Sequence, residues 1–151
     1  MAEFPWISRI NDDILGLIFL HNTLHDDDFA ELGFSNPNNV CLITARDTSQ
    51  VCSRWRSAIL NSPLLWANII DLDHLNQQND HWTIEVIERT KTCPLSVRGH
   101  LGMRQRDYVS SFFMDLLSKH WSRFRRLQIY VTNPWADDRR WDTLERPAPY
   151  L

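Results

Sequence analysis

The segment Ser49–Trp66, with the sequence SQVCSRWRSAILNSPLLW, constrains the fold more than any other part of this 151-residue chain. In a helix with 3.6 residues per turn, the apolar side chains here lie along one stripe, which contains Ala45, Val51, Cys52, Trp55 and Ile59. Polar side chains fall on the opposite side. The pattern therefore predicts an amphipathic helix from Thr44 to Leu60 that buries one face.

The ends of this helix are also predicted locally. Thr44 is a suitable N-cap, and Asp47 can reach back to the cap amide. Asn61 suits the position just after the last turn, and Ser62 and Pro63 are typical of the start of a second helix. We expect that short second helix to be anchored by apolar side chains, those of Leu64, Leu65 and Trp66.

An earlier helix is predicted from Ile10 to Leu20, with Asn11 or Asp12 as its cap. Its apolar residues do not form a single stripe, because Ile10, Ile14 and Leu17 face one way while Leu15 and Phe19 face nearly the reverse. The helix is too short to span a bilayer, and a helical unit of about 60 residues is only marginally able to bury its own apolar surface. The sequence therefore predicts that a second protein covers one side, and it leaves open which side.

These residues resemble the F-box, a three-helix module, and most closely the F-box-like sequences of mushroom-forming fungi. The family's Val-Cys-x-x-Trp-Arg is matched by Val51, Cys52, Trp55 and Arg56, and its Pro-x-Leu-Trp by Pro63, Leu65 and Trp66. Its Leu-Pro pair, acidic residue and Ile-Leu are matched more loosely by Ile10 to Leu15, because Asn11 stands in place of the proline.

The resemblance implies an adaptor, without catalytic activity or cofactor, that binds a Skp-type protein and through it a cullin. Such an adaptor recruits a protein substrate to a Skp-cullin-F-box ubiquitin ligase for ubiquitin-dependent degradation. The module would cover residues 5–70. The adaptor-binding residues that the resemblance and the two-sided helix indicate are Ile10, Asn11, Ile14, Leu15, Ile18, Phe19, Val51, Cys52, Trp55, Pro63, Leu65 and Trp66.

The following segment, residues 71–131, alternates between strand and helix patterns. Strands are predicted at Asn68–Leu72, at Leu95–Leu101 and around Leu127–Val131, with helices at Asp80–Lys91 and after Asp107. This order is typical of parallel strands with helical crossovers, and loosely of leucine-rich repeats. The fold class is thus a mainly α three-helix F-box module followed by a short α/β, leucine-rich-repeat-like segment, and we expect residues 132–151 to form a disordered tail.

Composition limits the classes of partner. The net charge of −3 provides no general attraction to nucleic acid. Three cysteines leave at least one unpaired, which favours a reducing compartment, and neither a signal peptide nor a membrane span is apparent. We expect an intracellular protein, cytoplasmic or nuclear, that binds neither nucleic acid nor membrane.

The sequence offers candidate residues for a metal site, a nucleophilic triad and a phosphate-binding cluster, and we disfavour each. His21, His25 and Asp26–Asp28 could bind a metal, but no further ligand stands at a suitable spacing. Ser110, Asp115 and His120 could form a nucleophilic triad, but they have neither a glycine elbow nor an oxyanion device. The third candidate is a phosphate-binding cluster of arginines, Arg123, Arg125 and Arg126, which also suits a solvated helix end.

Two alternative functions remain open at this point. The first is a helix-turn-helix nucleic-acid binder that uses Thr44–Leu60 as its recognition helix, with Arg46, Arg54 and Arg56 outward. The long connection from the first helix and the overall charge are both unfavourable to it. The second is a truncated F-box interaction protein that has no ligase client.

Overall fold

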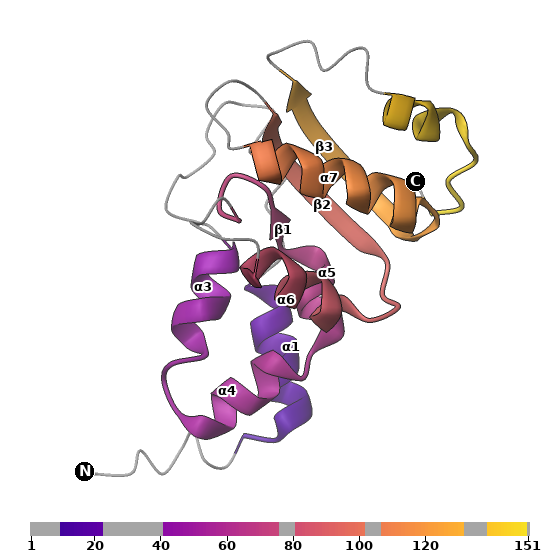
Figure 1. Ribbon diagram of the computed structural model, residues 1–151. Coiled ribbons are helices and arrows are strands. Elements are labelled where there is room, and N and C mark those ends of the chain that lie inside the picture. The colour runs from indigo at the N-terminus through magenta and orange to yellow at the C-terminus, as the bar shows by residue number, and fades with distance from the viewer. Residues whose placement is uncertain (1–9, 23–40, 76–80, 102–106, 132–138, 151) are drawn as a thin grey trace, which may run out of the picture.

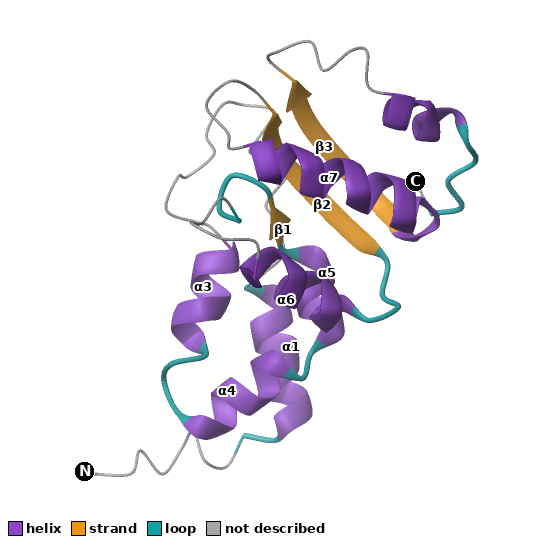
Figure 2. Cartoon of the chain, in the orientation of Figure 1, coloured by secondary structure: helices purple, strands orange, loops and turns teal. Residues whose placement is uncertain are grey.

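The computed structural model describes residues 10–22, 41–75, 81–101, 107–131 and 139–150. Its first part contains the helices α1 (Asp12–His21), α3 (Cys41–Thr48), α4 (Ser53–Leu60) and α5 (Pro63–Asn68). The remainder is β1 (Ile70–Asp71), α6 (His81–Thr90), β2 (Leu95–Leu101), α7 (Asp107–His120), the 3-10 turn η2 (Trp121–Arg123), β3 (Phe124–Val131) and the 3-10 segment η3 (Arg139–Glu145). Figures 1 and 2 show the helical part below the sheet. A helical first part followed by an α/β part is confirmed.

Helix α1 begins where the sequence predicts. Asn11 is its N-cap, with the side-chain Oδ1 accepting a hydrogen bond of 3.2 Å from the backbone N–H of Asp13. The acidic residues Asp12 and Asp13 lie in the first turn, where the helix dipole favours negative charge. The side chains of Leu15 and Phe19 are buried, so this side of α1 faces the interior of the protein.

The single helix predicted from Thr44 to Leu60 is wrong, because the chain forms two helices, α3 and α4, separated by a turn at residues 49–52. Thr44 lies inside α3, where its carbonyl accepts a 2.6 Å bond from the Thr48 hydroxyl, and the Ser49 hydroxyl donates to the Arg46 carbonyl at 2.6 Å. Such hydroxyl bonds offer the backbone an alternative to continuing a helix. Cys52 then starts α4 as its N-cap.

The change from α4 to α5 follows the prediction closely. Asn61 is the C-cap of α4, and its backbone N–H donates to the Ser57 carbonyl at 3.0 Å. Ser62 is the N-cap residue of α5 with Pro63 in the first turn, although the Ser62 side chain makes no capping bond. Proline is tolerated there because the first amide of a helix has no partner inside the helix.

Strands β1, β2 and β3 form a 3-stranded sheet in that order, and both neighbouring pairs are parallel. The predicted parallel arrangement is therefore confirmed. Gly99, in β2, has a φ of +144°, and a Cβ at this position would lie 2.7 Å from the Cβ of Leu72. The residue after β1 can approach β2 this closely because position 99 is a glycine.

The two faces of the sheet differ in character. Val97 and Leu101 of β2 are buried, and Figure 1 shows α7 lying across the sheet. Side chains alternate between the faces of a strand, so Arg98 and His100 point to the other face, together with Tyr130 of β3. That face is polar and partly exposed to solvent.

The helical part and the sheet share one hydrophobic core. Trp66 of α5 meets Trp82 of α6 edge to face, with ring centroids 5.9 Å apart, and the Arg89 guanidinium lies 5.7 Å from the centroid of the Trp66 ring. Aromatic pairs in this geometry add about 0.5–1.5 kcal/mol beyond the burial of their surface. Trp66 therefore joins the two parts of the chain.

The prediction of a disordered tail fails for residues 139–150. The Trp141 ring of η3 lies against Phe113 of α7, with centroids 6.0 Å apart, and the indole N–H of Trp121 donates to the carbonyl of Arg146 at 3.0 Å. The tryptophan in this polar segment provides the apolar surface that anchors it to α7. Residues 132–138 lie outside the described part of the chain.

Candidate docking surface on α1

One side of α1 exposes three large apolar side chains next to one another. Ile14, Leu17 and Ile18 have exposed fractions of 54%, 65% and 43%. Their spacing of three and four residues places them on one helix face, which we call the outer face of α1. The two-sided pattern in the sequence is therefore resolved, with Leu15 and Phe19 buried and Ile14, Leu17 and Ile18 exposed.

Contacts with α4 hold α1 in this orientation. The Arg54 guanidinium binds Asp12 Oδ1 through Nε at 2.8 Å and through Nη2 at 2.7 Å, and it also donates to the carbonyl of Ile10. On the inward side, the Phe19 ring meets Trp55 edge to face, with centroids 5.2 Å apart. The polar clamp at the start of α1 and the aromatic pair near its end fix which side chains remain outward.

The interior between these helices is filled by the protein itself. One void between them has a volume of about 10 Å³ and lies beside Phe19, Ala45, Ile59 and Leu65. A space of this size holds at most about one water molecule. This void is therefore too small to hold a small-molecule ligand.

The predicted adaptor-binding residues divide into three groups by burial. Four of them are buried in this chain and cannot offer surface to a partner without unfolding, namely Leu15, Phe19, Leu65 and Trp66. Three are half-buried, namely Ile10, Trp55 and Pro63. The exposed ones are Asn11, Ile14, Ile18, Val51 and Cys52.

Val51 and Cys52 lie in the turn before α4, three and two residues before Arg54. Because Arg54 binds Asp12, this turn is close to the start of α1, and Figure 1 shows both at the same end of the helical part. Val51 is 60% exposed and adds apolar surface at that end.

The list derived from sequence omitted three exposed apolar residues of the described helical part, namely Leu17, Ile43 and Leu64. Leu17 is the most exposed member of the outer face, and Leu64 of α5 is 39% exposed. The periodicity of α1 already placed Leu17 on the same side as Ile14, so the signal was present. For Leu64 no such signal existed, because three successive apolar residues do not show which of them turns outward.

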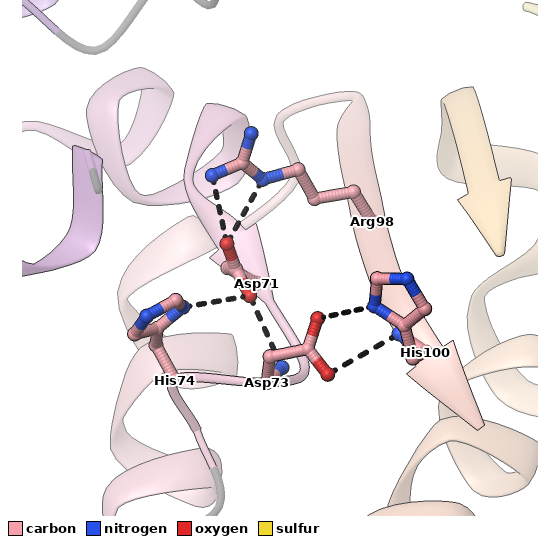
Figure 3. A network of polar contacts seen from close by, with 5 residues as sticks. All are labelled: Asp71, Asp73, His74, Arg98 and His100. Carbon is pink, nitrogen blue, oxygen red and sulfur yellow. Dashed lines mark hydrogen bonds and ion pairs between the residues drawn. The ribbon is translucent and has the colours of Figure 1, made fainter. Parts of the chain in front are cut away.

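The ends of β1 and β2 carry a polar network, drawn in Figure 3. Asp71 is buried, and its carboxylate accepts bonds from Arg98 at 2.8 and 2.9 Å and lies 3.1 Å from His74 Nδ1. Asp73 lies 2.9 Å from His100 Nδ1, and the His100 ring stacks on Tyr130. These contacts connect β1 and the turn after it to β2, so the network stabilises the pairing of the two strands.

The three residues proposed as a nucleophilic triad do not meet. Ser110 is buried and Asp115 binds Lys119 at 3.1 Å. A rise of 1.5 Å per residue places Ser110 and His120 about 15 Å apart along α7. The arrangement found in the structure therefore cannot activate a serine.

His120 instead lies near the end of α7, with Nδ1 3.3 Å from Nη1 of Arg123. Burial, followed by the charges of Arg123 and Lys119, lowers the pKa of His120 below its ordinary value. Arg123 also donates to the carbonyl of Cys93 at 2.9 and 3.1 Å and to Thr90 Oγ1 at 2.7 Å. Within the predicted arginine cluster, Arg123 is thus committed to internal bonds.

Among the residues described, no group of three or more His, Cys, Asp or Glu side chains is placed to hold a metal ion. The other histidine and the acidic run of the predicted metal site, residues 25–28, lie outside the described residues. In the same described ranges, no helix has both the length and the apolar character needed to cross a membrane. Comparisons with protein-family models, with curated proteins and with solved structures found no match.

Proposed function

We propose that this chain is an F-box-like adaptor that binds a Skp-type protein through the outer face of α1. The observation that carries the proposal is the exposure of Ile14, Leu17 and Ile18 on a helix whose opposite side is already buried. The resemblance of the sequence to the F-box supplies the identity of the partner.

The outer face suits a protein partner on energetic grounds. These side chains are 43–65% exposed, so covering the exposed part of each would stabilise a complex by about 1–1.5 kcal/mol. Three such side chains on one helix face offer a protein groove an apolar strip. Apolar patches of this kind on small proteins mark interaction sites.

The proposed mechanism is proximity. An adaptor that holds a substrate protein near a charged ubiquitin carrier makes the transfer effectively intramolecular. No chemical step then falls to this chain. Its contribution is the rigid connection between the docking helix α1 and the α/β part, which the Trp66–Trp82 contact supports.

The nucleic-acid alternative loses its main element in this structure. A recognition helix over Thr44–Leu60 is absent, because the chain turns between α3 and α4. Arg54, one of the arginines that this alternative places outward on the recognition helix, binds Asp12. The net charge of −3 is likewise unfavourable to binding DNA or RNA.

The test is co-purification of the full chain with a fungal Skp-type adaptor. Leu17→Asp places a charge in the outer face of α1 without entering the core, so we expect the complex to be lost while circular dichroism remains unchanged. The matched control is Ile84→Asp on α6, where an aliphatic residue is also exposed. Absence of a complex with the folded wild-type chain, or equal loss with the control, would sink the proposal.

Ubiquitylation separates the adaptor from an F-box interaction protein without a client. A Skp-bound chain that recruits substrates promotes cullin-dependent ubiquitylation of the proteins it captures. Leu17→Asp should abolish that modification together with Skp binding. A stable Skp complex that never supports cullin-dependent ubiquitylation would leave the interaction protein as the function.

A further inference from the structure

The two edges of the sheet are very different. β1 contributes only residues 70–71, whereas β3 is 8 residues long and pairs with β2 on one side. Within the described ranges, no strand pairs with the other side of β3. A long edge strand offers a row of backbone donors and acceptors to another strand unless it is blocked by proline or by shortness, and β3 contains no proline.

The direction of the backbone groups in β2 follows from a bond to the residue after β1. The N–H of Leu72 donates to the carbonyl of Arg98 at 2.9 Å, so the backbone groups of Arg98 face β1. Consecutive residues of a strand direct these groups to alternate sides. The backbone groups of Val97 and Gly99 therefore face β3.

The register then assigns the free groups of β3. Val97 is paired with Leu127 and Gly99 with Ile129. In a parallel pair, a residue bonds to the neighbours of its partner rather than to the partner itself. The residues flanking Leu127 and Ile129 therefore face β2, and the backbone groups of Leu127 and Ile129 point outward from the edge.

We infer that this edge pairs with the β3 edge of a second copy of the same chain, antiparallel and about a two-fold axis at Gln128. In that register Leu127 of each copy lies opposite Ile129 of the other, and these are the residues with outward backbone groups. Gln128 lies opposite Gln128 of the second copy. The two sheets join into one continuous sheet, and this association is independent of the proposed docking on α1.

The side chains of β3 are self-complementary in this register. Leu127 and Ile129 are half-buried at the margin of the core, so pairing them across the edge extends the apolar layer. On the polar face, Arg126 lies opposite Tyr130, which is 65% exposed and offers its ring to the cation. No two like charges face each other.

A bulge disfavours the register with its axis at Leu127. The pairing of β2 with β3 shifts at Leu95 and Ser96, where Phe124 and Arg126 are successive partners and Arg125 is the extra residue. An axis at Leu127 would run the new ladder through this bulge. With the axis at Gln128, Arg125 lies at the end of the new ladder, opposite the exposed Val131 of the second copy.

Cross-linking tests the register directly. Because the backbone groups of Gln128 face β2, the pair at the axis is not hydrogen-bonded, and its Cα atoms lie about 4.5 Å apart, within the range of a disulfide. In the full chain with Cys52→Ser, we expect Gln128→Cys to form a covalent dimer on mild oxidation. Lys119→Cys, on the exposed surface of α7, is the matched control. Equal cross-linking of the two variants would overturn the proposal.

Charge substitution tests it without a covalent bond. Gln128→Lys places two ammonium groups opposite each other, and Gln128→Glu two carboxylates, on an exposed position that leaves the fold intact. We expect light scattering to show a two-fold rise in the mass of the wild type with concentration, no rise for either variant, and recovery of the dimer when the variants are mixed. A wild-type chain that stays monomeric, or variants that do not complement each other, would refute the pairing.

Discussion

The indole N–H of Trp66 donates a hydrogen bond of 2.9 Å to the backbone carbonyl of Ile59, and both residues are buried. Trp66→Phe removes this donor and part of the ring while keeping an aromatic side chain. We expect the free energy of unfolding to fall by about 1–3 kcal/mol, as for a lost buried bond, and Trp66→Ala to cost about 3–5 kcal/mol. Urea unfolding measures both, and equal stability of Trp66→Phe and wild type would contradict the contact.

Truncation to alanine should lower the stability of the fold at Leu15 but hardly at Leu17. Leu15 is 1% exposed, so Leu15→Ala leaves a cavity and should cost about 2–5 kcal/mol. Leu17→Ala removes a side chain from the surface and should change stability by less than about 0.5 kcal/mol. Thermal unfolding of the two variants tests which side of α1 faces the core, and the reverse order of stability would show that the helix is rotated.

Gly99→Ala should destabilise the sheet. The added Cβ would lie 2.7 Å from the Leu72 side chain, and the φ of +144° is unfavourable for alanine. Overpacking of this kind costs about 1–3 kcal/mol, and the backbone strain adds to it. Chemical denaturation provides the measurement, with Ser96→Ala on the same strand as the control that should be nearly neutral.

The Asp71–Arg98 pair should show coupling in a double-mutant cycle. Asp71→Ala leaves the Arg98 guanidinium without its buried acceptor, and the loss should be about 1–3 kcal/mol because Arg98 keeps part of its exposure to water. Arg98→Met leaves the carboxylate with the Asp73 amide and His74. We expect the double variant to be more stable than the sum of the two single losses indicates, and simple additivity would show that the contact in Figure 3 contributes nothing.

His120 should make stability depend on pH. Its pKa in the folded chain is lowered from the ordinary 6.5 by burial and by the charges of Arg123 and Lys119, so the unfolded chain binds the proton more readily. Stability is therefore retained above the unfolded pKa and falls as the pH drops through it. Relative to His120→Gln, the wild type should lose stability between about pH 7.5 and about pH 5.5. Urea titrations at the two pH values measure this difference, and parallel losses in both proteins would exclude the effect.

Local sequence signals predicted much of the fold. The cap at Asn11, the stop at Asn61 and the restart at Pro63 each depend on one or two neighbouring residues, and all three were found. The strands around Val97 and Ile129 were predicted from alternation, and their parallel order followed from the intervening helix. Such features need no knowledge of distant contacts.

The failures have physical causes. The turn between α3 and α4 contains neither glycine nor proline, and the apolar spacing continues across it, so periodicity indicated one helix. Its signal was the hydroxyl pair Thr48 and Ser49, which bond back to the helix. η3 was missed because its anchor, Trp141, depends on a contact with Phe113 that no local pattern shows.

The docking surface was predicted only in part for a related reason. Sequence identified α1 as apolar on both sides, but which side remains outward depends on the Phe19–Trp55 and Asp12–Arg54 contacts. Those contacts join residues more than thirty-five positions apart.

The packing of η3 against α7 also bears on how the chain folds while it is being made. Domains acquire structure as they leave the ribosome, at about 5–20 residues per second. The contacts that Phe113 of α7 and Trp121 of η2 make with this segment form only after residues 139–146 have emerged, and β3 has emerged before them. During that interval the nascent chain exposes an apolar helix face and a long strand edge at the same time. We expect a chaperone that prevents aggregation to act at this stage.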